Sequence, residues 1–185
     1  MSKKGLSIRD MCYMALFTAL IIVLSQLPPI PMPMGVPMTL QTFIIPLTGV
    51  VLGAKRGFFS VLTYCLLGAV GLPVFVGSSG FVGGLGILFG VTGGFIFGFP
   101  FYALFAGLGA AQGGHVRLIC GLLIGMVITY LLGMVQFSLV TGMNLHATSI
   151  AVVWPFLPTE MVKLVLVFIL GPRIRRRLEK SGLLT

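Results

Sequence analysis

The sequence has very few charged side chains. Only 8% of its 185 residues are Asp, Glu, Lys or Arg, and just three of these are acidic. A soluble domain of this size has about a quarter of its residues charged, which keeps its surface in water. Since 57% of the residues are hydrophobic, the chain is excluded from the soluble globular class. The same shortage excludes a nucleic-acid-binding protein, which needs Lys and Arg gathered on one surface.

Motifs of metal sites and catalytic centres are also missing. The three cysteines stand singly within apolar segments, so neither a disulfide framework nor a zinc site is indicated. The glycine-rich segments contain no G-x-x-x-x-G-K-[ST] sequence, and there is no H-E-x-x-H motif or Ser-His-Asp set. We therefore expect no enzyme activity, no metal or other cofactor, and no ATP hydrolysis by this chain.

Long apolar segments are abundant instead. A helix of about 20 apolar residues crosses a bilayer, and six segments approach that length. They are residues 11–27, 38–54, 57–72, 85–108, 116–140 and 149–171. The second and third meet at Lys55 and Arg56, and fusing them into one helix would place both charges inside the bilayer, at about 2.5–3.5 kcal/mol each. The sequence thus predicts an all-α integral membrane protein, a single membrane domain over 1–185 with six transmembrane helices.

The positive charges lie on one side of this six-helix arrangement. All but one of the 12 Lys and Arg residues precede the first helix, separate the second from the third, begin the fifth or follow the sixth. The opposite loops, roughly 28–37, 73–84 and 141–148, have none. The positive-inside rule therefore predicts cytoplasmic termini and a basic cytoplasmic tail, 172–185. The outer loops are rich in Pro and Gly, which favours an ordered lid over a site; alternatively they are short connections at the lipid headgroups.

Small residues at four-residue spacing predict where membrane helices meet, because close backbone approach holds them together. Glycines with this spacing, for which packing inside the bundle is expected, are Gly49 and Gly53, Gly121 and Gly125, and the stripe Gly86, Gly90, Gly94 and Gly98. Ala15 and Ala19 have the same spacing near the cytoplasmic end of the first helix. There they would meet either another helix of the bundle or a partner protein.

One apolar segment, the sixth, contains a pair of ionisable residues. Glu160 and Lys163 are three residues apart, so they share a helix face. Ionisable residues inside a membrane are candidates for function, although a purely structural ion pair is the alternative. In a binding site, Lys163 would offer a cation to a carboxylate, and Glu160 would accept hydrogen bonds from N–H groups. The pair predicts a ligand with a carboxylate at one end and amide-like N–H groups at the other.

Further polar and aromatic side chains are candidates for the same outer cavity. The polar candidates are Thr39, Gln41, Thr42, Ser78, Ser79 and Thr92. Aromatic walls are expected from among Phe43, Phe75, Phe81, Tyr102, Trp154 and Phe156. A lone Ser or Thr more often bonds to its own backbone than to a ligand, so each is a weak candidate by itself.

Four segments together closely resemble the BioY family, the biotin-binding substrate-capture (S) components of energy-coupling factor transporters. They read PMTLQTF, LLGAVGLPVF, GILFGVTGGFIFGF and PFLPTEMVK, and the resemblance runs from about residue 10 to 172. The chain departs from the family pattern at Val91, where the family usually has Pro, and at Glu160, where it usually has Asp. Ser78 and Ser79 occupy a region where the family often has Asn.

This resemblance implies that biotin is captured at the outer face of a bacterial or archaeal plasma membrane. A transmembrane coupling subunit and two cytoplasmic ATPases, which alone bind ATP, would then deliver it inward. With the candidates above, the expected biotin contacts are Glu160, Lys163, Ser78, Ser79, Thr39, Gln41, Thr92, Gly93, Phe43 and Tyr102. Ala15 and Ala19 resemble the motif by which S components dock on the coupling subunit. Two alternatives stay open: an S component for another small vitamin, and a homo-oligomeric membrane scaffold with a structural Glu160–Lys163 pair.

Overall fold

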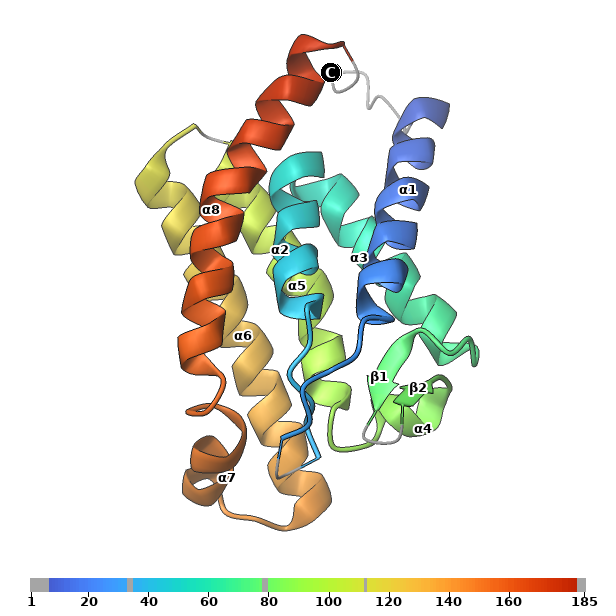
Figure 1. The fold of residues 1–185 in the computed structure, drawn as a ribbon, viewed down its shortest axis with the longest axis vertical. Coiled ribbons are helices and arrows are strands. Elements are labelled where there is room, and N and C mark those ends of the chain that lie inside the picture. Colours follow the sequence, from blue (N-terminus) through green and yellow to red (C-terminus); the bar gives the residue numbers. More distant parts are fainter. Residues whose placement is uncertain (1–6, 33–34, 78–79, 112, 183–185) are drawn as a thin grey trace, which may run out of the picture.

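The structure is a computed structural model that describes residues 7–32, 35–77, 80–111 and 113–182, most of them helical (Figure 1). The helices are α1 (Ile8–Ser25), α2 (Gln41–Leu52), α3 (Ala54–Ala69), α4 (Leu85–Leu88), α5 (Gly93–Ala111), α6 (His115–Thr141), α7 (Leu145–Val152) and α8 (Leu157–Lys180). A short antiparallel hairpin of β1 (Phe75–Gly77) and β2 (Gly80–Val82) lies between α3 and α4.

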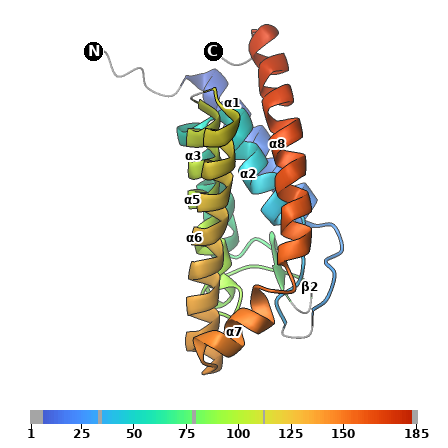
Figure 2. The ribbon, with the colours of Figure 1, turned by 90° about the vertical axis from the view of Figure 1, so that its left-hand side faces the viewer.

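The long helices form two layers (Figure 2). Helices α3, α5 and α6 make one layer, and α1, α2 and α8 make the other. The start of α1 and the end of α8 lie at the same end of the molecule, where the Arg9 guanidinium donates to the Gly182 carbonyl at 3.1 Å. An ion pair of 2.9 Å between Asp10 and Arg56 ties α1 to the start of α3 at that end. The hairpin and α7 lie at the opposite end.

Among the described residues, three helices are long and apolar enough to cross a membrane: α1, α5 and α6. A fourth span arises if α7 and α8, which are bent by 59° relative to one another, are counted together. Helix α2 is apolar but shorter. The count of six transmembrane helices and the cytoplasmic placement of both termini therefore stay predictions.

Two of the expected helices are broken. The segment 85–108 divides into α4 and α5, with residues 89–92 between them, and the segment 149–171 divides into α7 and α8, with residues 153–156 between them. Gly90 lies in the first break and Gly93 follows it as the first residue of α5; glycine lowers the cost of leaving the helix there. Pro155 lies in the second break and Pro158 in the first turn of α8. Proline is tolerated in a first turn because the N–H that it lacks would have no acceptor within the helix.

Glycines bring the central helices into close contact. A methyl group at Gly49 would collide with the Ala103 backbone of α5, and one at Gly98 would collide with Thr129 of α6. Gly94 meets the Leu132 backbone in the same way, so packing inside the bundle is confirmed for these positions. Gly86 differs from the expectation, because it lies before the break and faces open space.

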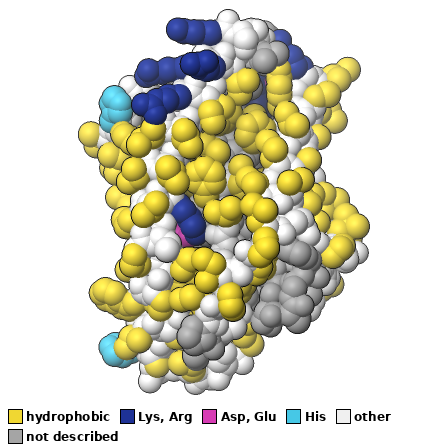
Figure 3. Space-filling view, viewed as in Figure 1, with side chains coloured by type: hydrophobic (Ala, Val, Ile, Leu, Met, Phe, Trp, Pro, Cys, Tyr) yellow, Lys and Arg dark blue, Asp and Glu magenta, His cyan; other side chains and the backbone are white. Residues whose placement is uncertain are grey.

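The surface has the character of a membrane protein. On the face shown in Figure 3, hydrophobic side chains cover the middle and Lys and Arg gather at one end. We call this end, with Arg173, Arg175, Arg176, Arg177 and Lys180 on the last turns of α8, the basic end. Large apolar side chains such as Val23, Val127 and Val162 are exposed, which suits contact with lipid rather than water.

Candidate ligand-binding site

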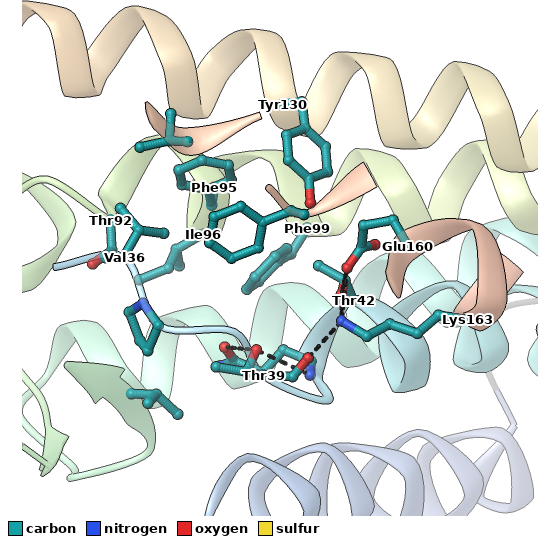
Figure 4. Close-up of a pocket in the computed structure, with 15 residues that line it drawn as sticks. Val36, Thr39, Thr42, Thr92, Phe95, Ile96, Phe99, Tyr130, Glu160 and Lys163 are labelled. Atoms are coloured by element: carbon teal, nitrogen blue, oxygen red, sulfur yellow. Dashed lines mark hydrogen bonds and ion pairs between the residues drawn. The ribbon is translucent and has the colours of Figure 1, made fainter. Parts of the chain in front are cut away.

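A pocket lies in the half of the molecule away from the basic end, where the two broken helices and the loop before α2 meet (Figure 4). Its lining residues are Val36, Pro37, Thr39, Gln41, Thr42, Val76, Thr92, Phe95, Ile96, Phe99, Tyr130, Val152, Phe156, Glu160 and Lys163. Most of these side chains are apolar, and the polar ones lie mainly on α2, α8 and the loop before α2. A mostly apolar pocket with a few polar groups on one wall is typical of a small-molecule site.

Glu160 and Lys163 form a buried ion pair in the polar wall of this pocket. The Lys163 Nζ donates to Glu160 Oε1 at 2.7 Å, and the two residues are 9% and 1% exposed, respectively. Thr42 on α2 joins them, because its hydroxyl donates to Glu160 Oε1 at 2.6 Å and accepts from Lys163 Nζ at 2.9 Å. The pair predicted from sequence spacing is thus a three-residue network between α2 and α8.

The start of α8 suits the Glu160 carboxylate. Glu160 lies in the first turn of this helix, where the helix dipole and the unpaired N–H groups favour negative charge. Lys163 follows one turn later and supplies the counter-charge. Because a lone buried ion costs several kcal/mol and an ion pair with satisfied hydrogen bonds costs much less, the position of Glu160 and its partner Lys163 together make the buried charges tolerable.

The free hydrogen-bonding capacity of this network is an acceptor, not a donor. A lysine ammonium has three donor positions, and those of Lys163 are all used: by Glu160 Oε1, by Thr42 and by the Thr39 carbonyl at 2.8 Å. Glu160 Oε2, in contrast, is buried and has no hydrogen-bond partner among the described residues. An unpaired buried carboxylate oxygen is costly. The site therefore lacks an N–H or O–H donor, which a ligand can supply.

Thr39 and Gln41 line the pocket but also hold its wall in place. The Thr39 hydroxyl donates to Gln41 Oε1 at 3.1 Å, and the Gln41 amide donates to the Tyr64 hydroxyl at 2.5 Å. Tyr64 on α3 then donates to the Val74 carbonyl at 3.0 Å. This chain of bonds fixes the loop before α2 against α3 and the segment that enters the hairpin.

The aromatic wall differs from the sequence-based expectation. It consists of Phe95 and Phe99 on α5, Tyr130 on α6, and Phe156 before α8; only Phe156 was among the candidates. The other expected residues with described side chains, Phe43, Phe75, Tyr102 and Trp154, do not line this pocket.

These other aromatic side chains lie elsewhere for separate reasons. Phe43 follows Thr42 on α2, and one residue turns a helix by about 100°, so Thr42 faces the pocket and Phe43 does not. Tyr102 is buried against Gly125 of α6. Phe75 stacks edge-on against Tyr64, with 5.5 Å between ring centroids, and Trp154 is exposed.

Thr92 and Gly93 lie at the break between α4 and α5. Thr92 lines the pocket, as expected. Gly93 begins α5 and packs tightly against the Leu88 carbonyl and the Gln136 side chain, where a larger residue would collide. It does not line the pocket. Ser78 and Ser79 fall outside the described residues.

Gln136 is a residue that the sequence analysis missed. Its side-chain amide, on α6, donates to the Leu88 carbonyl at 2.6 Å and to the Gly90 carbonyl at 2.8 Å. Leu88 is the last residue of α4 and Gly90 lies in the α4–α5 break, where the Gly90 carbonyl also accepts from the Gly93 N–H at 3.2 Å. Gln136 thereby positions the segment that contributes Thr92, Phe95 and Ile96 to the pocket. A polar amide within the 27-residue apolar helix α6 was the signal that could have identified it.

We predict that Gln136→Leu loosens the α4–α5 break, because the Leu88 carbonyl loses its side-chain donor and the Gly90 carbonyl keeps only the Gly93 N–H. A buried carbonyl left without a donor costs about 1–3 kcal/mol. Hydrogen–deuterium exchange of residues 88–96 is expected to accelerate, and the midpoint of thermal unfolding to fall. Thr141→Val is the matched control, since the Thr141 hydroxyl donates to Phe137 of its own helix. Equal exchange in wild type and Gln136→Leu would contradict the positioning role.

The pocket is small in this structure. Its volume is about 50 Å³, which holds a few waters, whereas sites for drug-sized ligands span about 300–1,000 Å³. A vitamin-sized ligand therefore requires the walls to separate. Residues 35–40, which contribute Val36, Pro37 and Thr39, form the longest lining segment outside the regular helices and strands, so we expect this loop to move when a ligand enters.

Ala15 and Ala19 lie far from the pocket, on the exposed face of α1. The opposite face of this helix packs on the bundle: Phe17, Thr18 and Ile21 are buried, and the Thr18 hydroxyl donates to the Ser60 carbonyl of α3 at 2.9 Å. The two alanines therefore do not pack inside the bundle. Their small side chains are open to lipid or to a partner.

Metal binding has no visible basis in the described part of the chain. Within residues 7–32, 35–77, 80–111 and 113–182, no three His, Cys, Asp or Glu side chains gather as potential ligands.

Comparison with known proteins gives consistent results. A model of the BioY family matches residues 1–180. The chain is 39% identical to a "Probable biotin transporter BioY" of Pyrococcus horikoshii over 168 residues, which cover 90% of this chain and 96% of that protein. It is 37% identical to a "Biotin transporter BioY" of Thermotoga maritima over 170 residues, covering 91% and 96%. The fold is similar to a crystal structure of the S-component for biotin from an ECF-type ABC transporter, with a TM-score of 0.81, 28% identity and 95% of each chain covered.

Proposed function

The chain belongs to the BioY family, and from this membership we propose that it is the biotin-binding S component of an energy-coupling factor transporter. The observation that carries the proposal is the pocket with its buried Glu160–Lys163 pair and unpaired Glu160 Oε2. Biotin is a fused bicycle, in which a ureido ring with two N–H donors shares an edge with an apolar sulfur-containing ring, and it ends in a carboxylate tail. The ureido N–H is the donor that Glu160 Oε2 lacks, and the aromatic wall suits the bicyclic body.

The geometry of the site allows only one end of an extended biotin to contact the Glu160–Lys163 ion pair. The charged atoms of Glu160 and Lys163 lie 2.7 Å apart, whereas the sulfur-containing ring and a four-carbon chain separate the ureido group of biotin from its carboxylate. An extended biotin cannot place both ends on this pair. Because Lys163 has no free donor and Glu160 has a free acceptor, we assign the ureido end to the pair. The carboxylate contact expected for Lys163 would require Lys163 to exchange one of its three acceptors.

A ureido group also presents a C=O beside each N–H. With the N–H donating to Glu160 Oε2, this carbonyl would face the Lys163 ammonium, and it is the acceptor that could replace the Thr39 carbonyl. Since Thr39 belongs to the loop that must move to widen the pocket, the exchange and the loop movement would be one event. Glu160 and Lys163 thus distinguish ligands by the adjacent donor and acceptor of a cyclic urea.

In the membrane we propose six spans with both termini in the cytoplasm. The proposal counts α4 with α5 and α7 with α8 as one span each, beside α1, α2, α3 and α6. It places the basic end in the cytoplasm, in accordance with the positive-inside rule, and turns the pocket outward. Biotin would enter from outside, and a coupling subunit with two ATPases would drive its release inward.

Competition at equilibrium tests the proposed ligand. We expect unlabelled biotin to displace labelled biotin from the purified protein, and thiamine and riboflavin to leave it bound. Methylation of the ureido nitrogens should weaken displacement at least about tenfold, since each lost hydrogen bond to a charged group is worth about 1.5–3 kcal/mol. If another vitamin displaces biotin at equal concentration, the chain is an S component for that vitamin. If no vitamin binds, the result favours the alternative of a membrane scaffold with a structural Glu160–Lys163 pair.

A further inference from the structure

A second cavity lies at the basic end of the molecule. It has a volume of about 260 Å³ and lies between the turn that joins α5 to α6 and the last turns of α8. Glycines and alanines of this turn form one wall, and Leu118 and Pro172 add apolar atoms. His115, Arg175, Arg176 and Glu179 provide the polar lining. This cavity plays no part in the proposed biotin site, which lies in the other half of the molecule.

Helix α8 is fixed to α2 beside this cavity. Gly171 packs directly against Val50 of α2, and one turn later Arg175 Nη1 donates to the Val50 carbonyl at 3.3 Å. Helices α5 and α6 belong to the other layer (Figure 2). The small side chains of the turn do not fill the space that remains between the layers at this end.

Positive charge exceeds negative charge around the cavity. Arg175 pairs with Glu179, with 2.8 Å between Nε and Oε1, so the charges of these two residues cancel. Arg176 is exposed, and in the described part of the chain no hydrogen bond or ion pair engages it. The ring of His115 lies 5.7 Å from that of Phe168 on α8, which places a second polar group on the opposite side. The cavity thus fits one anion with Arg176 as its cation.

The level of the cavity points to a lipid. On α6, next to the lining residues His115 and Leu118, Val116 and Ile119 expose 73% and 44% of their surface, with the exposed Arg117 between them. Apolar and basic side chains therefore meet at the level of the cavity. A phospholipid at this level places its phosphate among basic side chains and its acyl chains along the apolar helix surface; basic pockets between transmembrane helices bind such headgroups. We propose that this cavity binds the phosphate of an anionic phospholipid, and that the lipid bridges α8 to the α5–α6 turn.

The test compares arginines of the same tail. The protein is purified in a neutral detergent, and its thermal unfolding is followed while dioleoylphosphatidylglycerol, dioleoylphosphatidylcholine or inorganic phosphate is added. We expect phosphatidylglycerol to raise the unfolding midpoint of the wild type, and phosphatidylcholine to do so far less. Arg176→Gln should weaken the phosphatidylglycerol effect at least about fivefold in apparent affinity, as expected for one basic residue at the membrane surface.

Arg173→Gln and Arg177→Gln remove the same charge from the same helix end without touching the cavity lining, and they should retain the wild-type response. Biotin binding by Arg176→Gln should equal that of the wild type, because this inference does not depend on the biotin site. An equal loss in all three variants would mean diffuse attraction to the basic surface and would overturn the proposal. A shift of the same size with inorganic phosphate would also overturn it, since the ligand would then be a free anion.

Discussion

Replacing Lys163 by alanine is expected to weaken biotin binding at least about a hundredfold. The substitution leaves the Glu160 carboxylate buried without its cation, and breaking a buried pair in this way costs about 3–5 kcal/mol. Glu160 then either takes up a proton, which makes it a weaker acceptor, or turns from the pocket, and in both cases the hydrogen bond from the ureido N–H is weakened or lost. Equilibrium binding of labelled biotin measures the loss. Lys180→Ala, the same substitution on the exposed end of the same helix, is the control and should bind as the wild type does.

Two further measurements keep this prediction decisive. Glu160→Gln preserves the shape of the side chain but replaces one carboxylate oxygen with an NH2 group. The variant should therefore fold and still lose much of its affinity for biotin. Biotin amide, which lacks the carboxylate charge, should lose as much affinity as biotin does when Lys163 is replaced, because the ureido end meets the pair. If the substitution instead affects biotin strongly and biotin amide hardly at all, Lys163 binds the carboxylate and our assignment of the ends is wrong.

Replacing Ala15 by tryptophan is expected to abolish biotin uptake while leaving biotin binding unchanged. Ala15 and Ala19 are exposed on α1, and the opposite face of α1 packs on α3. A bulky side chain at Ala15 therefore does not disturb the bundle or the distant pocket. It does prevent the close backbone approach that small residues permit between membrane helices, and so would block docking of the coupling subunit.

Two measurements compare uptake with binding: biotin uptake into proteoliposomes that contain the complete transporter, and biotin binding by the purified chain. Leu139→Trp is the control, because Leu139 is 79% exposed on α6, away from α1, and a bulky residue there should leave uptake intact. If Ala15→Trp loses biotin binding as well as uptake, the substitution disturbs the structure of the chain and not only its docking. Normal uptake would show that this face of α1 does not dock.

Much of the architecture followed from the sequence because the relevant signals are local. An apolar segment long enough to cross a bilayer predicts a helix, and α1, α2, α3 and α6 lie close to the expected segments. Glu160 and Lys163 were identifiable because charged residues are rare in such segments, and their three-residue spacing is enough to predict a common face. The sequence did not decide whether Ala15 and Ala19 pack inside the bundle or are exposed, since a small-residue pair does not reveal which surface it meets.

The remainder depends on tertiary structure. Hydropathy does not detect a break in the backbone, so residues 89–92 and 153–156 were assigned to continuous helices. The aromatic wall was largely missed because 11% of the residues are aromatic, and only the rotation of each helix decides which of them face the pocket. The occupied donors of Lys163 were likewise invisible, because the Thr39 carbonyl reaches it from 124 residues away along the chain.

Isothermal titration of the purified protein with biotin tests the central claim most directly. We expect saturable heat with one biotin per chain and a dissociation constant in the micromolar range or below, and the heat should be lost in Glu160→Gln. No heat at micromolar biotin from folded wild-type protein would contradict the account.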